Sequence, residues 1–270
     1  MTARQIYAVL AAGIENPHLF ERWQKNPGSL RAYGIDPDCF DLDALRKFAG
    51  LTVKVRHNGL REWLPMTFRL LNVAGLEIEV FAAYAIFRAS KNLRYAATTE
   101  ERTDDLMAFL EHWLNFSNTE HALLWDMIRH EQALAQLNQP APGEVCMPAV
   151  SEQPLSGASI PGIHGEIILY EMQSNPAEVA LELRKSKPQL TTVLLEDHYF
   201  CYWRTGEARE IITLELDAFG YYVLTFVNGD HTIGDISYHL GGGHRPTPDF
   251  LRAITELAAV GIVEFRPTGR

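Results

Sequence analysis

The sequence predicts an α+β protein, in which an all-helical N-terminal domain precedes a small antiparallel sheet that carries three helices. Two patterns support this fold class. Apolar residues recur at helical spacing from Thr2 to about Leu137, and no strand pattern interrupts them. From Leu190 onward, apolar and polar residues alternate, which is typical of strands, and three helical segments follow. Residues 138–162 hold five prolines and form an expected exposed linker.

Six or seven helices are expected in the domain of residues 1–137. The first begins after Thr2, and a second region is interrupted at Asn26-Pro27-Gly28 and closed by Gly34. Proline at position 65 should kink or restart the helix at residues 60–73, because it lacks a backbone donor. The others are expected at residues 45–55, capped by Asp41 or Asp43, and at Leu76–Arg88, Thr99–Phe116 and Thr119–Leu137.

The C-terminal domain, residues 163–270, begins with a strand at His164–Met172 and a helix capped by Asn175. Three short strands are then expected at residues 191–195, 198–204 and 208–216. Three helices follow, starting at Asp217, Thr232 and Pro246–Asp249, and Gly261 precedes a last strand. This order predicts a winged-helix-like module, which binds either DNA or an added peptide strand.

The charge of the C-terminal domain favours a peptide over DNA as the partner. Of the formal net charge of −10, the part from Ile163 onward carries 9 basic and 15 acidic side chains. A module that reads DNA needs cations on its third helix, because neutralised phosphates supply most of the affinity. Here the helix Phe250–Val260 has Arg252 as its one cation, beside Glu256. We therefore expect no nucleic-acid partner, and a winged-helix transcription regulator stays an alternative.

The cysteines indicate neither a disulfide framework nor a zinc site. Cys39, Cys146 and Cys201 are odd in number and widely spaced, which fits a reducing compartment. His198 and Cys201 should point to opposite faces of their strand, so they do not form a nucleophile and base. Because no apolar run is long enough to span a bilayer, we expect a cytoplasmic protein without a membrane partner.

A second alternative is a stand-alone helical di-iron oxidase of the haem-oxygenase-like type. Carboxylates and imidazoles gather on two predicted helices, and Asp126 and His130 share a helix face at a spacing of four. However, no Glu or Asp of this cluster is followed three residues later by His, so its ligand set is incomplete. We expect no catalytic and no metal-binding residue in this chain. The cluster comprises Glu111, His112, Glu120, His121, Asp126, His130 and Glu131.

The third strand of the module is the expected binding edge. Alternation should turn Ile212, Leu214 and Leu216 toward the helices, with Ile211, Thr213 and Glu215 on the other face. A peptide that adds to a sheet needs an open strand edge and a neighbouring apolar groove. The competing possibility is that another segment, such as the strand at His164–Met172, covers this edge.

Beyond these patterns, the chain resembles a known family. Its strand and helix order from Thr191 to Val260, with LLEDHYFCYWR, VNGDHTIGDI and ITELAAVGIVEF, is similar to the recognition element of enzymes that modify ribosomally made peptides. The pyrroloquinoline quinone chaperone subunit is the simplest member of that group. ERWQKNPGSLRAYGIDP, RKFAGLTVKVRHNGLREWLPMTFRLL and LLWDMIRHEQAL resemble the partner proteins of multinuclear non-haem iron-dependent oxidative enzymes. Those partners act in methanobactin and 3-thiaglutamate biosynthesis, and the 3-thiaglutamate partner is the more similar.

The resemblance implies a non-catalytic subunit that binds a precursor peptide and presents its cysteine to an iron-dependent TIM-barrel enzyme, as a heterodimer. In the 3-thiaglutamate pathway that enzyme excises the β-carbon of a C-terminal cysteine. Iron would then belong to the partner subunit, with no cofactor in this chain. The peptide-binding residues implied for the third strand and third helix are Arg209, Glu210, Ile211, Ile212, Thr213, Leu214, Leu251, Arg252 and Thr255.

Overall fold

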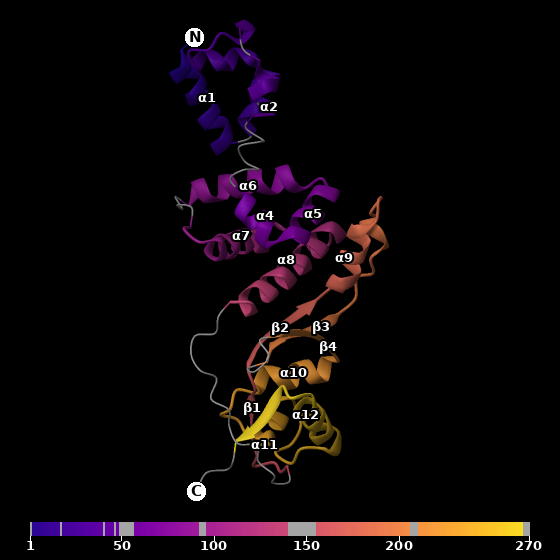
Figure 1. Ribbon diagram of the computed structural model, residues 1–270. Helices are drawn as coiled ribbons and strands as arrows, with labels where there is room; N and C mark the ends of the chain where they lie inside the picture. The colour runs from indigo at the N-terminus through magenta and orange to yellow at the C-terminus, as the bar shows by residue number, and fades with distance from the viewer. Residues whose placement is uncertain are drawn as a thin grey trace. The chain divides into compact units, whose positions relative to one another are not determined.

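The computed structural model describes residues 2–16, 18–39, 41–45, 47–48, 57–91, 96–139, 155–205 and 210–266. It is a mixed helix and sheet protein of the α+β class, as predicted (Figure 1). The chain divides into two compact units. The first combines Met1–Ile128 with Ala180–Thr192, and the second combines Arg129–Val179 with Val193–Arg270. These bounds differ from the expected domains because the helix that ends at Leu137 contributes its last turns to the core of the second unit.

The first unit opens with α1 (Ala3–Glu15) and α2 (His18–Lys25), followed by the 3-10 helices η1 (Pro27–Tyr33) and η2 (Pro37–Cys39). Trp23 is buried at the centre of their apolar cluster, with its ring edge-to-face against Phe20 and Tyr33. Gly34 ends η1 with a φ of 71°, a left-handed conformation that favours glycine. The interruption and the closing glycine of this region are as the sequence predicts.

Proline at position 65 restarts the next helix, as predicted. The helix α4 (Asn58–Trp63) ends two residues before it, and α5 (Pro65–Val73) begins on it. The apolar face of α5, with Phe68, Leu70 and Leu71, is fully buried. The helices α6 (Glu77–Ser90), α7 (Thr99–Trp113) and α8 (Thr119–Leu137) follow, and Asn118 accepts hydrogen bonds from the first amides of α8.

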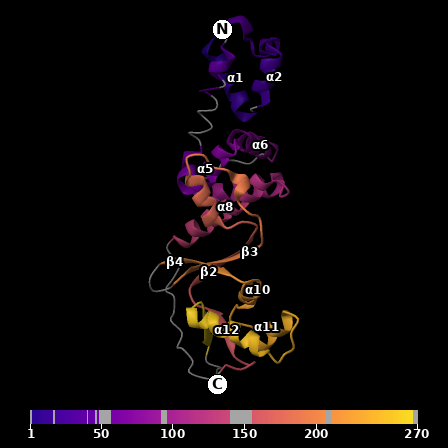
Figure 2. The same cartoon turned by 90° about the vertical axis from the view of Figure 1, so that its right-hand side faces the viewer.

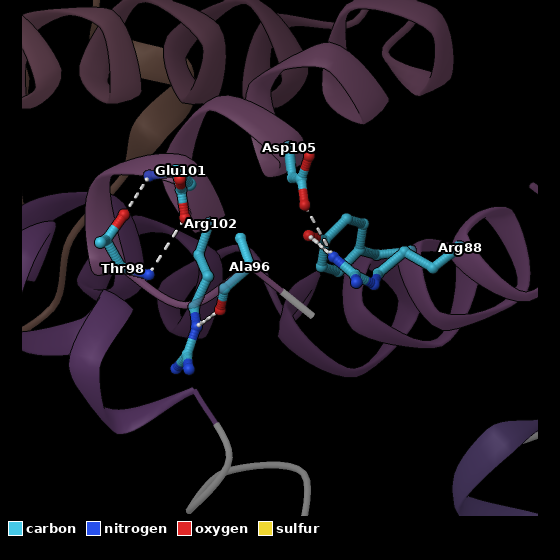
Figure 3. A network of polar contacts seen from close by, with 7 residues as sticks. Arg88, Ala96, Thr98, Glu101, Arg102 and Asp105 are labelled. Carbon is cyan, nitrogen blue, oxygen red and sulfur yellow. Dashed lines mark hydrogen bonds and ion pairs between the residues drawn. The ribbon is translucent and has the colours of Figure 1, made fainter. Parts of the chain in front are cut away.

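A polar network links α6 and α7 inside the first unit (Figure 3). The guanidinium of Arg88 is buried, and it donates to the Tyr84 hydroxyl at 3.0 Å and to the Asp105 carboxylate at 2.9 Å. At the start of α7, Thr98 and Glu101 form a reciprocal capping box. The bonds of Arg88 compensate the cost of burying its charge. The capping box satisfies amides at the end of the helix and so fixes where α7 begins.

In the described residues, no single helix is both long and apolar enough to cross a membrane. Pro65–Val73 and Glu77–Arg88 reach that length and composition only as a pair, and they meet at an angle of 112°.

The second unit contains two antiparallel sheets. The larger has the order β2-β3-β4, from β2 (Glu166–Met172), β3 (His198–Arg204) and β4 (Ile211–Leu216). In the smaller sheet, β1 (Ile160–Ile163) pairs with β5 (Val263–Arg266). The strand β2 confirms the one expected at His164–Met172, and β4 confirms residues 211–216 of the strand expected at residues 208–216.

Three capped helices follow β4 and lie together on one side of the larger sheet (Figure 2). They are α10 (Ala218–Phe226), α11 (Ile233–His239) and α12 (Pro248–Val260). The side chains of Asp217, Thr232 and Thr247 accept hydrogen bonds from the first turns of these helices. The helix α9 (Pro176–Arg184) begins after Asn175, which accepts the Ala177 amide as the expected cap.

Both faces of the larger sheet are covered. Trp203 of β3 packs with Val223, Ile236 and Ile254 of the three helices on one face. On the opposite face, the last turns of α8 place Ala133 and Leu137 in a cluster with Met172, Phe200 and Tyr202. Arg204 bonds the Leu137 carbonyl at 2.7 Å and also the carboxylate of Glu166, so one buried cation joins the end of α8 to the sheet.

The prediction of a first strand at residues 191–195 is wrong. Leu190–Thr192 forms the 3-10 turn η3, in which the Thr192 hydroxyl donates to the Gln189 carbonyl. Leu194 is 72% exposed, and the following residues continue without strand pairing up to His198. The place beside β3 is taken by β2 instead, whose seven residues pair with all seven of β3.

A segment assigned to the linker belongs to the second unit. Residues 160–163 form β1, and the carbonyls of Gly157 and Ser159 accept the Gly234 and Ile233 amides at the start of α11, both at 2.9 Å. The backbone approaches so closely here that a Cβ at Gly234 would lie 2.8 Å from the His244 carbonyl oxygen. The absence of a side chain at Gly234 therefore permits this close packing of the backbone.

We expect Gly234→Ala to destabilise the second unit by about 1–3 kcal/mol, because the added methyl group meets backbone oxygens that cannot move independently. Thermal unfolding of the full chain measures the effect. The matched control is Gly243→Ala, where the nearest atom to the added Cβ is 3.9 Å away and no loss is expected. Equal stability of the two variants would contradict the close contact.

Candidate functional site

The strand β4 lies at an edge of the larger sheet. It pairs with β3 on one side, while β2, the segment considered as a possible cover, pairs with the opposite side of β3. Within the described part of the chain, no strand pairs with the other side of β4. The edge expected to be open for strand addition is therefore not covered by the strand at His164–Met172.

The ladder register shows which backbone groups point away from β3. The Thr205 amide donates to the Glu210 carbonyl, so the pair of residues 205 and 210 is a hydrogen-bonded one. Hydrogen-bonded and non-bonded pairs alternate along an antiparallel ladder. Ile212, Leu214 and Leu216 therefore bond β3, and the amides and carbonyls of Ile211, Thr213 and Glu215 point outward.

The side chains of β4 divide between two faces as the alternation predicts. Ile212, Leu214 and Leu216 pack against the cluster formed with the three helices, although each stays partly exposed. Ile211 joins the cluster on the α8 face, where Thr213 and Glu215 are exposed. The neighbouring strand β3 is buried almost throughout. The apolar surface of β4 is thus incompletely covered.

The opposite edge of the sheet, formed by β2, is engaged by side chains. On the α8 face, the Arg129 guanidinium lies over the Tyr170 ring at 5.2 Å, and the Tyr170 hydroxyl donates to Gln132 at 3.4 Å. On the helix face, Tyr221 of α10 forms a hydrogen bond with the Glu171 backbone, and burial together with the Glu171 carboxylate raises the pKa of Tyr221. The edge of β4 is therefore the less protected one.

Helices α10 and α12 supply apolar side chains next to β4. The helix α10 packs on β3 and β4, and α12 packs against α10 and β5. Phe219 lies in the first turn of α10, two residues after the helix cap Asp217. Its side chain is 42% exposed and contacts Phe250 of α12 edge-to-face, with ring centroids 5.7 Å apart. Leu251 is partly buried in the same cluster. An exposed aromatic ring thus borders the C-terminal end of β4.

The remaining residues implied for the site differ in how accessible they are. Thr255 is exposed and donates its hydroxyl to the Leu251 carbonyl at 2.6 Å. Arg252 is exposed, but it pairs with Asp249 at 3.2 Å and Glu256 at 3.9 Å on its own helix. Glu210 is exposed at the start of β4, and Arg209 lies outside the described residues. The one cation of α12 is thus already partnered by carboxylates.

The titratable cluster of the di-iron alternative is dispersed in the structure. His121 accepts the Asn115 amide and stacks on Trp113 with ring centroids 5.0 Å apart. His130 is hydrogen-bonded to the Tyr202 hydroxyl at 2.9 Å, and burial lowers its pKa to about 4. Among the described residues, no group of three His, Cys, Asp or Glu side chains gathers as a metal site would require.

Cys201 and His198 point to opposite faces, as predicted. Cys201 lies in the cluster beneath the helices, where burial raises the pKa of its thiol to about 12. His198 instead bonds the Glu215 carboxylate at 2.6 Å and stacks near Phe200. A thiol with so high a pKa stays protonated at neutral pH, so Cys201 is unsuited to nucleophilic attack.

Sequence reasoning missed Phe219 as part of this surface. It also missed the bond between Glu215 and His198, because these residues lie 17 positions apart and on different strands. The first had a usable signal: a large aromatic residue in the first turn of a helix whose cap is Asp217. In comparisons with known proteins, no family model matches the chain and no curated protein is significantly similar to it.

Proposed function

We propose that this protein is a non-catalytic partner subunit that binds a ribosomally made precursor peptide by strand addition at β4. The observation that carries the proposal is the outward row of backbone groups at Ile211, Thr213 and Glu215, next to partly exposed apolar side chains. A guest strand gains main-chain hydrogen bonds from such an edge and side-chain selectivity from the apolar surface beside it.

The charges of the second unit support a peptide guest over a nucleic acid. The helix α12 has one cation, which is paired on its own helix, and the strands beside it are rich in carboxylates. A winged-helix-like arrangement with such a third helix lacks the phosphate contacts that a duplex requires. We therefore take the three helices and the larger sheet as a winged-helix-like peptide-recognition module.

The proposed reaction belongs to a second subunit. By its resemblance to the partner proteins of multinuclear non-haem iron-dependent enzymes, the chain would present the cysteine of its guest to an iron-dependent TIM-barrel oxidase in the cytoplasm. Holding the guest raises the effective concentration of the reacting residue at the metal. The proposed chemistry is 3-thiaglutamate-type excision of the β-carbon from a C-terminal cysteine.

Amide hydrogen exchange tests the proposal at the level of single residues. In the free chain we expect fast exchange at Ile211, Thr213 and Glu215, and slow exchange at Ile212, Leu214 and Leu216, which bond β3. A precursor peptide encoded beside this protein should slow the first three amides selectively. The internal control is the second set, whose exchange should barely change.

Two outcomes would overturn the proposal. Protection of the β2 amides without protection of β4 would place the guest on the wrong edge, and protection nowhere would exclude strand addition. Co-purification then tests the complex: we expect the chain to retain a candidate iron-dependent subunit, and more of it when the precursor peptide is present. Loss of the subunit under both conditions would remove the proposed partner.

A further inference from the structure

A strand that adds to β4 has its side-chain pattern fixed by the ladder. In an antiparallel pair, directly opposite residues place their side chains on the same face of the sheet. Guest residues opposite Ile212, Leu214 and Leu216 therefore face the cluster beneath the helices. Guest residues opposite Thr213 and Glu215 face the other side, where both of these side chains are exposed.

Among the described residues, the outer face and the ends of this edge are acidic. Glu215 is 47% exposed, Glu210 is exposed at the start of β4, and Asp217 is exposed directly after it. The sequence from Glu210 to His244 contains no Lys or Arg. On β3, Arg204 is buried against Glu166 and two backbone carbonyls, so its charge is used within the fold.

Glu215 is held in place rather than free to turn away. Its Oε1 atom contacts the His198 Nδ1 atom at 2.6 Å, and its Oε2 atom accepts from the Asn175 amide group at 3.2 Å. Diagonal neighbours in a ladder lie within reach of long side chains. A cation opposite either Thr213 or Glu215 can therefore reach this fixed carboxylate.

We propose that the guest of β4 is a basic amphipathic strand, with apolar residues at every second position and Lys or Arg between them. This inference rests on the proposed function and adds the chemistry of the peptide. The apolar positions continue the cluster at Ile212 and Leu214, and the cations meet Glu215 on the outer face. A second copy of this chain is a poor occupant, because its β4 edge carries the same acidic residues.

A displayed library of random twelve-residue peptides, selected on the full-length chain at low salt, tests this composition. We expect enriched peptides to alternate apolar residues with Lys or Arg, and their binding to weaken as salt is added, since exposed pairs are screened. Enriched peptides that alternate apolar with neutral or acidic residues would overturn the inference while leaving strand addition intact. Recovery of no peptide that protects the β4 amides would overturn both.

A charge-neutral variant links the preference to Glu215. Glu215→Gln keeps a group able to bond His198 and Asn175, and it should weaken a selected basic peptide by up to about fivefold, as expected for one cross-strand pair. The matched control is Glu62→Gln, an exposed acid on α4 that should leave affinity unchanged. Equal affinity of both variants would contradict the role of Glu215.

Dimerisation through β4, seen by light scattering and lost on peptide addition, would make a second copy the occupant and overturn the inference.

Discussion

Thr213→Pro is expected to weaken peptide binding strongly and leave the protein folded, whereas Leu214→Pro is expected to destabilise the second unit. The two positions are adjacent on β4 and differ in where their amides point. Thr213 directs its amide away from β3, and Leu214 directs its amide toward the Cys201 carbonyl. Proline removes the amide hydrogen in both cases, so the pair separates guest binding from fold stability.

The expected magnitudes follow from the lost hydrogen bonds. With proline at position 213, the guest strand loses the hydrogen bond from the Thr213 amide, and the guest carbonyl that accepted it is left unpaired. Binding should therefore weaken roughly tenfold to a hundredfold. The fold should lose less than about 1 kcal/mol, because proline is tolerated on the open side of an edge strand. At Leu214 the loss of a ladder bond and of a partly buried side chain should cost about 2–4 kcal/mol.

Fluorescence anisotropy of a labelled peptide measures binding, and hydrogen exchange within β3 and α10 reports whether the second unit is folded. Thr213→Val is the matched control: it keeps the amide and a β-branched side chain, so it should bind the peptide like the parent. Peptide binding by folded Thr213→Pro at parent affinity would show that the guest does not pair with this edge.

Acidification should destabilise the second unit through His130. Its imidazole is partly buried against Tyr202, and this burial lowers its pKa from 6.5 to about 4. The unfolded chain therefore takes up this proton at a higher pH than the folded protein does. The stabilising contribution is complete above pH 6.5 and is lost as the pH falls through 4, and it amounts to about 3 kcal/mol.

The variant His130→Gln isolates this contribution. Its amide has no proton to gain between pH 7 and 4, and it retains polar atoms that can bond the Tyr202 hydroxyl. Urea unfolding at several pH values gives the free energy of unfolding of parent and variant across this range. All other titrating groups are common to both proteins, so the difference between them is due to His130. We expect the parent to lose about 3 kcal/mol more than the variant on going from pH 7 to 4. If the free energies of unfolding of parent and variant fell equally with pH, the pKa of His130 in the folded protein would not be lowered.

Local chemistry made much of the helical part predictable. The bounds of α8 at Thr119–Leu137 agree with the expected ones, and the proline at position 65 restarts its helix where a missing donor requires it. The caps at Asp217 and Thr232 were also predictable, because a side-chain oxygen before an apolar run satisfies amides within three residues. Each of these depends on atoms that are near one another in the chain.

The strands were less predictable because their partners are distant in sequence. The alternation in residues 191–195 resembles that of a strand, yet these residues have no neighbour to pair with and form a turn. The strand β2 takes that place from about thirty residues earlier in the chain, a choice decided by pairing with β3. Similarly, composition marked residues 160–163 as linker, although they pair with β5.

The sequence by itself determined the fold class, the two faces of β4 and the shortage of cations on α12, because periodicity and charge are properties of neighbouring residues. Only the tertiary structure decided which edge of the sheet has no strand paired to it in the described part of the chain, and which amides of β4 point outward. Those depend on the ladder with β3, on the side chains that engage β2 and on the packing of the last turns of α8 against the sheet. Contacts between segments far apart along the chain carry no local signal, so the candidate site emerges only once the strands are paired.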